Sequence, residues 1–122
     1  MKTAYFLLFF GLLFSIGYSQ ESGCEKFKIG KFLYTSEGLP DITVTRTKNT
    51  QTETIKESKE VMEGTIVWKS NCTYDFTFSK CPTKELLGKT MSVEIFDAKG
   101  NTAKGKASFE GMNVNFNLEK LE

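Results

Sequence analysis

The sequence predicts an all-β protein, and three observations lead to that prediction. Apolar and polar residues alternate with a period of two through most of the chain after residue 20. No stretch of a dozen residues there keeps the apolar stripe of an amphipathic helix. Short polar segments rich in turn-forming residues separate the alternating runs. We therefore expect about eight short strands in a single domain over residues 20–122.

Residues 1–19 are predicted to be a signal peptide that precedes this domain. Lys2 is followed by the apolar run Ala4–Phe14, and the small residues Gly17 and Ser19 mark a cleavage site. The run is shorter than the roughly 20 apolar residues of a transmembrane helix, so we expect no membrane span. The predicted location is secreted or periplasmic.

The strands follow from the alternation and from the turns between them. Gly38–Asp41, Lys48–Asn49 and Lys99–Gly100 are predicted turns, and Gly30 is a predicted bulge or bend within the first strand. The first four strands are expected over residues 26–34, 42–47, 50–57 and 61–69. The last four carry the alternating sets Tyr74, Phe76 and Phe78; Met91, Val93 and Ile95; Ala103, Gly105, Ala107 and Phe109; and Met112, Val114, Phe116 and Leu118.

One connection is long, from Lys80 to Lys89. Pro82 suits a first helical position and Gly88 suits a C-terminal cap, so residues 83–87 are predicted as one helical turn. Leu86 and Leu87 of this turn are expected to close one end of the domain.

The connections also predict the topology. Short links favour sequential antiparallel strands. Eight strands with one apolar face each close into an up-and-down (meander) β-barrel, which leaves no edge exposed. A two-sheet β-sandwich is the alternative.

The predicted core nearly fills such a barrel, so any pocket should be shallow. Phe32, Tyr34 and Phe96 fall off the inward pattern and are expected on the surface. The large side chains expected inside are Phe27, Ile29, Ile42, Val44, Ile55, Met62, Ile66, Trp68, Tyr74, Phe76, Phe78, Met91, Val93, Ile95, Met112, Val114, Phe116 and Leu118.

Cys24 and Cys72 are predicted to form a disulfide, with Cys81 free. In a meander the starts of strands one and five lie at the same end, where Cys24 and Cys72 stand. An extended segment from residue 72 to residue 79 spans roughly 25 Å, which excludes a bond between Cys72 and Cys81. A reduced pair is the alternative, as is a lipidated Cys24, although Glu21 stands where a lipobox has leucine.

Charge and composition exclude several classes of function. After removal of the predicted signal peptide, which contains Lys2, about 103 residues remain. They carry equal numbers of basic and acidic residues. A neutral domain lacks the basic face that binds nucleic acid. Histidine is absent from the sequence, and neither cysteine pairs nor acidic clusters show the spacing of a metal site. We therefore expect no catalytic activity, no metal and no cofactor.

One polar cluster stands out among the apolar residues. A two-residue turn at Lys48–Asn49 places Arg46, the single arginine, opposite Gln51, and Val44 opposite Glu53. Strand parity puts Arg46, Gln51 and Glu53 at the end that Leu86 and Leu87 do not close. There, with Trp68, they are predicted to line a cavity mouth and bind a ligand. The alternative is an Arg–Glu pair that closes a hairpin.

Six short segments carry a resemblance to a known group. They are Cys24 with Phe27, Gly30–Phe32, Ile42–Thr47, Gln51–Glu53, Val67–Lys69 and Cys72–Tyr74. On these residues the chain resembles short exported flavobacterial proteins of unknown function, several of which carry the label DNA topoisomerase IV. A neutral domain of this size cannot perform that activity. Gly30–Phe32 is also similar to the Gly-x-Trp opening of lipocalins, which implies a lipocalin-like barrel.

These observations predict a monomeric, non-catalytic binding module. The expected partner is a small apolar or amphipathic ligand held within the barrel. The alternative is a protein-interaction or inhibitor module with a filled core and an exposed aromatic patch.

Overall fold

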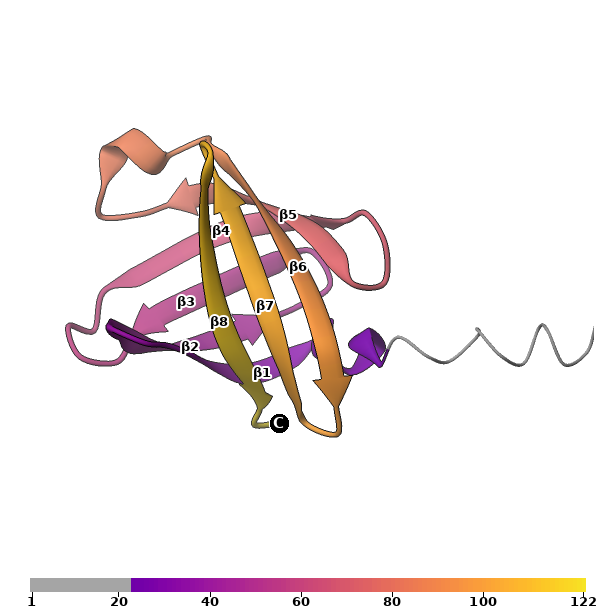
Figure 1. The fold of residues 1–122 in the computed structure, drawn as a ribbon. Coiled ribbons are helices and arrows are strands. Elements are labelled where there is room, and N and C mark those ends of the chain that lie inside the picture. Colours follow the sequence, from indigo (N-terminus) through magenta and orange to yellow (C-terminus); the bar gives the residue numbers. More distant parts are fainter. Residues whose placement is uncertain (1–22) are drawn as a thin grey trace, which may run out of the picture.

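The computed structural model describes residues 23–122, which form a closed antiparallel barrel of eight strands in sequential order (Figure 1). The predicted meander is therefore confirmed. The predicted signal peptide lies outside the described residues. No helix within residues 23–122 has the length and apolar character to cross a membrane.

The strands are short, and hairpin turns join most of them. Their bounds are β1 Gly30–Ser36, β2 Leu39–Arg46, β3 Thr50–Ile55, β4 Val61–Trp68, β5 Thr73–Lys80, β6 Thr90–Lys99, β7 Thr102–Phe109 and β8 Met112–Lys120. Two 3-10 helices complete the described chain, η1 at Cys24–Phe27 and η2 at Lys84–Leu86. We call the two ends of the barrel the η1 end and the η2 end.

The pairing of β2 with β3 has the predicted register. Arg46 pairs with Gln51, Val44 with Glu53 and Ile42 with Ile55. Antiparallel pairing of β8 with β1 closes the sheet, since Phe32 pairs with Lys120 and Thr35 with Asn117. Every strand thus has two neighbours, and no edge remains open.

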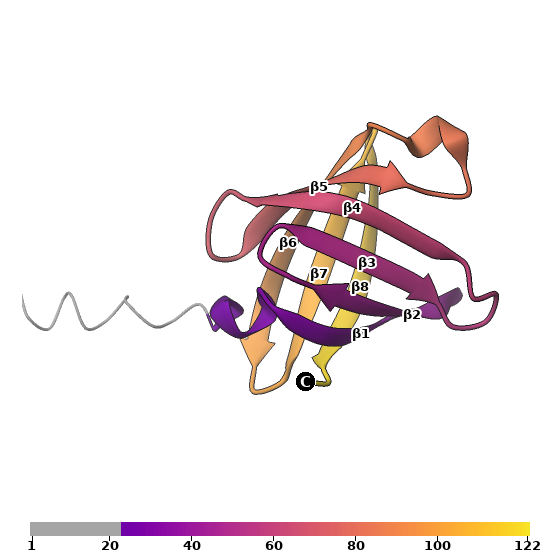
Figure 2. The ribbon, with the colours of Figure 1, turned by 180° about the vertical axis from the view of Figure 1, so that it is seen from behind.

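The start of the domain differs from the prediction. The first strand begins only at Gly30, because the 3-10 helix η1 occupies Cys24–Phe27 before it. Figure 2 shows this short helix next to the start of β1. Gly30 has a φ of 137°, and a Cβ there would lie 2.4 Å from the carbonyl oxygen of Glu122. The turn at Gly30 shifts the inward parity by one residue: Phe32 and Tyr34 are buried, whereas Ile29 is 56% exposed. The predicted surface positions of Phe32 and Tyr34 were therefore wrong.

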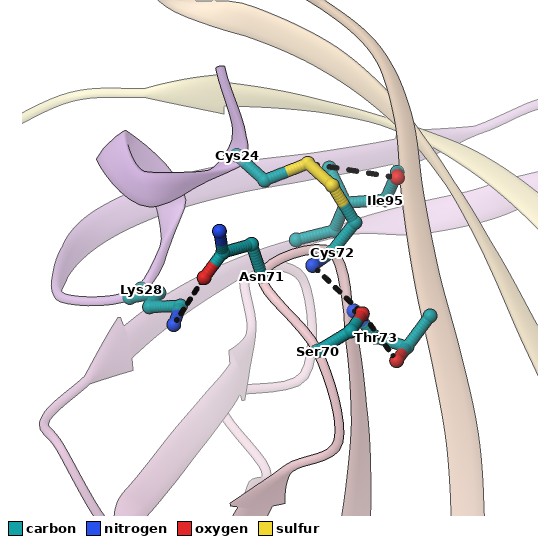
Figure 3. The surroundings of a disulfide bond; sticks show 7 residues. All are labelled: Cys24, Lys28, Ser70, Asn71, Cys72, Thr73 and Ile95. Atoms are coloured by element: carbon teal, nitrogen blue, oxygen red, sulfur yellow. Dashed lines mark hydrogen bonds between the residues drawn. A yellow bond between two sulfur atoms is a disulfide. The ribbon is translucent and has the colours of Figure 1, made fainter. Parts of the chain in front are cut away.

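The predicted disulfide is confirmed. Cys24 and Cys72 are bonded, with their Cα atoms 5.3 Å apart, and Cys81 is free. Figure 3 shows that the bond ties η1 to the turn before β5, where Lys28 also donates a hydrogen bond to the side chain of Asn71 at 3.2 Å. The N-terminal segment is thus fixed over one end of the barrel.

The η2 end is more open than the sequence suggested. Leu86 in η2 packs on the cluster around Phe78, but Leu87 is exposed. Met112 and Val114 at the start of β8 were expected inside, yet both are exposed because the barrel wall ends there without a cover. The predicted third strand also ends early, at Ile55, where the turn to β4 begins.

The core consists of two buried clusters inside the barrel. The first, near the η1 end, contains Phe27, Phe32, Val44 and Leu118 among others. The second is centred on Phe76 and Phe78 of β5. Gly64 permits this packing, because a Cβ there would lie within 2.6 Å of the Phe76 ring and of a backbone oxygen.

Replacing both Cys24 and Cys72 with serine is expected to lower the free energy of unfolding by about 4 kcal/mol. The reason is that the bond closes a loop with a sequence separation of 48 and so restricts the unfolded chain. Urea unfolding of the purified variant measures the loss. Cys81→Ser is the control, and an equal loss in that variant would contradict the prediction.

Candidate functional site

The interior of the barrel holds one buried positive charge, the guanidinium of Arg46, which is 1% exposed. Its Nε donates a hydrogen bond to Oε1 of Gln51 at 2.8 Å. Its terminal nitrogens donate to the carbonyl oxygen of Phe27 and to the hydroxyls of Tyr34 and Tyr74. Each guanidinium nitrogen therefore has a partner, as a buried charge requires.

Aromatic rings surround the same guanidinium. Its central carbon lies 4.7 Å from the centroid of the Phe32 ring and 5.0 Å from that of Tyr74. A guanidinium is weakly hydrated and stacks well on ring faces, so arginine suits this position better than lysine would. The rings and hydroxyls together replace the water that Arg46 loses on folding.

Gln51 connects Arg46 to Glu53. The amide oxygen of Gln51 accepts hydrogen bonds from Arg46 and from the Tyr74 hydroxyl, the latter at 3.0 Å. Its amide nitrogen donates to Oε2 of Glu53 at 2.6 Å. The amide therefore lies between the two charged side chains. Its oxygen faces the positive guanidinium of Arg46, and its nitrogen faces the negative carboxylate of Glu53. We call Arg46, Gln51, Glu53, Tyr34 and Tyr74 the Arg46 cluster.

Glu53 is the charged member of the Arg46 cluster that lines a cavity, which Tyr34 and Tyr74 line as well. One carboxyl oxygen accepts from Gln51, and the other has no protein partner. That second oxygen retains accessible surface, because no fully buried side-chain polar atom in the described chain lacks a hydrogen bond. Burial raises the pKa of Glu53 above its ordinary value, although Gln51 and the charge of Arg46 act in the opposite direction.

The cavity has a volume of about 200 Å³ and lies inside the barrel, at the η2 end. Its inner part is formed by Glu53, Tyr34 and Tyr74, and its walls are mainly apolar. The mouth lies between the β1–β2 turn and the start of β8. Lining residues there and along the walls include Ser36, Leu39, Pro40, Ile42, Met91, Val93, Ala107, Val114 and Phe116.

Larger hollows occur elsewhere, but they are less suited to hold a ligand. One of about 350 Å³ lies over Leu33, Lys104 and Glu119 on the outside of the sheet. Most of its lining points outward into solvent. In the described part of the chain, the cavity beside Glu53 combines mainly apolar walls with a buried polar group, which is the usual composition of a small-molecule site.

The structure brings three of the predicted site residues together, but the cavity does not open where the sequence predicted. Arg46, Gln51 and Glu53 are adjacent, yet η1 covers the η1 end where their mouth was expected. The cavity opens at the opposite end. Trp68 is half-buried, packs on the Tyr74 ring with centroids 4.7 Å apart, and does not line the cavity.

Two members of the Arg46 cluster, Tyr34 and Tyr74, were not among the predicted site residues. Tyr34 was expected outside on the assumption that the alternation continues through Gly30. The turn at Gly30 instead reverses the parity of β1 and places Tyr34 inside. Tyr74 was expected in the core, but only as an apolar ring. The signal for both was a single arginine predicted to face inward, since a buried guanidinium needs several acceptors.

No group of three or more acidic or cysteine side chains within residues 23–122 is placed to hold a metal ion. The titratable groups lining the cavity are Glu53, Tyr34 and Tyr74. Burial raises the pKa of Tyr34 well above its ordinary value, so its hydroxyl stays neutral and can share its proton with Tyr74, 3.3 Å away. The site can therefore accept or donate hydrogen bonds around one carboxyl group.

Arg46→Met is expected to lower the free energy of unfolding by about 3–5 kcal/mol. Methionine fills similar space but removes the donor to the Phe27 carbonyl and to both tyrosine hydroxyls, and it leaves Gln51 Oε1 with Tyr74 alone. Chemical unfolding at neutral pH measures this change. Lys48→Met, in the exposed β2–β3 turn, is the control, and similar small losses in both variants would contradict a structural role for Arg46.

Glu53→Gln is expected to change how stability depends on pH. Because the folded-state pKa of Glu53 is raised, its contribution is most favourable below the unfolded pKa and is lost as the pH rises through the folded pKa. The variant lacks this group. The stability of the wild-type protein relative to the variant should therefore fall from acid to neutral pH, which urea unfolding at a series of pH values will measure. A difference independent of pH would show that the pKa of Glu53 is not raised.

Comparison with known proteins adds no relative: no protein-family model matches the chain, and neither a curated protein nor a solved structure does. The resemblance to exported flavobacterial proteins therefore stays a prediction. The eight-stranded meander fits a lipocalin-like barrel in shape, but a shared fold does not by itself imply a shared function.

Proposed function

We propose that this protein is a non-catalytic binding module that holds a small ligand in the cavity beside Glu53. The observation that supports the proposal is a largely apolar cavity lined by Glu53, a buried side chain with one carboxyl oxygen that has no hydrogen-bond partner in the protein. Burial disfavours the ionised form of Glu53 and so raises its pKa. The ionised carboxylate is therefore less favourable in the folded than in the unfolded protein, and it opposes folding. Groups that oppose stability in this way are often retained for binding.

The volume of the cavity limits the size of the ligand. An apolar cavity of roughly 150 Å³ is known to bind benzene in another protein, whereas pockets for drug-sized ligands begin at about 300 Å³. At about 200 Å³, this cavity fits a single substituted ring or a short branched chain. A long acyl chain would extend through the mouth past Leu39 and Val114.

Binding is favoured over catalysis by the use of the polar groups. The guanidinium nitrogens of Arg46 are all engaged inside the protein, away from the cavity. Both tyrosine hydroxyls bond to Arg46 as well. Glu53 is thus the one lining side chain of the Arg46 cluster with an oxygen available for a ligand, and a single acceptor orients a ligand without transforming it.

The disulfide supports a location outside the cytoplasm. Bonds of this kind form and persist in oxidising compartments, so Cys24–Cys72 agrees with a secreted or periplasmic protein. We propose that the module acts there as a monomer, with η1 fixed over one end and the cavity open at the other.

Filling the cavity tests the proposal. Toluene should bind the wild-type protein and raise its melting temperature by several degrees, because a ligand at ten times its dissociation constant adds about 1.4 kcal/mol to the native state. Ala107→Ile places extra side-chain volume in the lining and should abolish this shift.

Ser108→Ile is the matched control, since Ser108 neighbours Ala107 on β7 and alternation turns its side chain to the outer face. This variant should keep the toluene response. Toluene binding that is equal in both variants, or absent from the wild-type protein, would reject the cavity as a binding site.

A further inference from the structure

We propose that the ligand of this cavity is a small organic ammonium ion, in which an apolar ring or branched chain carries one protonated amine that binds the free oxygen of Glu53. The inference rests on the proposed function and names the chemical class of its ligand. It follows from three features: the direction of the buried charges, the free acceptor and the aromatic lining.

Of the two buried charged side chains, Glu53 lines the cavity and Arg46 does not. Arg46 donates to the Phe27 carbonyl on its η1 side and to Gln51, and it does not line the cavity. Gln51 lies between Arg46 and Glu53, and no Arg46–Glu53 contact within salt-bridge distance occurs in the described chain. A ligand in the cavity therefore approaches the carboxylate first and the guanidinium last.

The free oxygen of Glu53 requires a donor rather than an acceptor. Its partner oxygen already accepts from Gln51 at 2.6 Å, so the carboxylate is held in one orientation. A protonated amine would form a charge-assisted hydrogen bond with it, about twice as strong as a bond between neutral groups. A ligand carboxylate would instead meet a like charge in a site of low dielectric constant.

Aromatic rings beside Glu53 also favour a cation. Tyr34 and Phe116 stack with ring centroids 4.6 Å apart, and both line the cavity together with Tyr74. The faces of such rings attract ammonium groups. The same barrel already holds the Arg46 guanidinium among rings, 5.0 Å from the centroid of Tyr74.

Proton binding by Glu53 should compete with the ammonium ion. The charged and titratable groups around Glu53 are Arg46 on β2, Tyr34 on β1 and Tyr74 on β5. Burial raises the pKa of Glu53 above its ordinary value, which favours the protonated carboxyl group as the pH falls. Acidification should therefore weaken binding of an ammonium ion but leave binding of a neutral analogue unchanged.

Three probes of similar size and different charge test the ligand class: benzylamine, benzyl alcohol and benzoate. Titration calorimetry of the wild-type protein at neutral pH should show benzylamine binding at least about ten-fold more tightly than benzyl alcohol. Benzoate should bind most weakly. Ala107→Ile should abolish benzylamine binding, which locates the amine in the cavity.

Glu53→Gln should remove the selectivity, leaving benzylamine and benzyl alcohol within about three-fold of one another. Glu63→Gln is the matched control, because Glu63 lies on neighbouring β4, outside the cavity lining, and its replacement changes the net charge equally. If Glu53→Gln fails to fold, a pH series on the wild-type protein replaces it. The advantage of benzylamine over benzyl alcohol should then shrink in acid, and a constant advantage overturns the inference.

The outcomes separate the inference from the proposed function. If toluene and benzyl alcohol bind while benzylamine shows no advantage, or if benzoate binds most tightly, the cavity is a binding site but not for ammonium ions. If neither toluene nor any of the three probes binds, both proposals fail. If benzylamine binds equally to wild-type, Ala107→Ile and Glu53→Gln proteins, its site lies elsewhere and the inference is wrong.

Discussion

The burial of Arg46 is the constraint on which the rest of the barrel interior depends. A guanidinium removed from water must keep its charge and find partners for its N–H groups. Here the partners come from four parts of the chain: the Phe27 carbonyl before β1, Tyr34 on β1, Gln51 on β3 and Tyr74 on β5. Arg46 thus links η1, β1, β3 and β5 directly. In the sheet, β1, β3 and β5 are not adjacent and are connected only through the strands between them.

This constraint also explains why the two ends of the barrel differ. At the η1 end, the Phe27 carbonyl must reach Arg46, and the Cys24–Cys72 bond keeps η1 in place. Within residues 23–122 no disulfide holds the η2 end, where Leu86 packs on the core but Leu87 and Val114 are exposed. The counter-charge, Glu53, lies beyond Gln51 on the side of the open end. The polarity of the cavity is therefore a consequence of how Arg46 is neutralised.

The alternation of residues predicted most of the fold because a period of two is a local property of each strand. The β2–β3 register followed from the two-residue turn at Lys48–Asn49, and the disulfide followed from strand parity. Both inferences needed only the order and direction of the strands. Tyr34 is buried, contrary to the prediction, because the alternation does not continue through Gly30, where a φ of 137° turns the chain and reverses which face points inward.

The sequence by itself determined the class of the fold, the meander and the pairing of Arg46 with Gln51, since each depends on neighbours along the chain or across one turn. Only the tertiary structure decided which end of the barrel is open and which polar group a ligand meets. Those features depend on where η1 docks and on how the Gln51 amide is oriented, and they arise from contacts such as Phe27 to Arg46, which are distant in sequence. Residue patterns do not encode such contacts, because many packings of the same strands satisfy the same alternation.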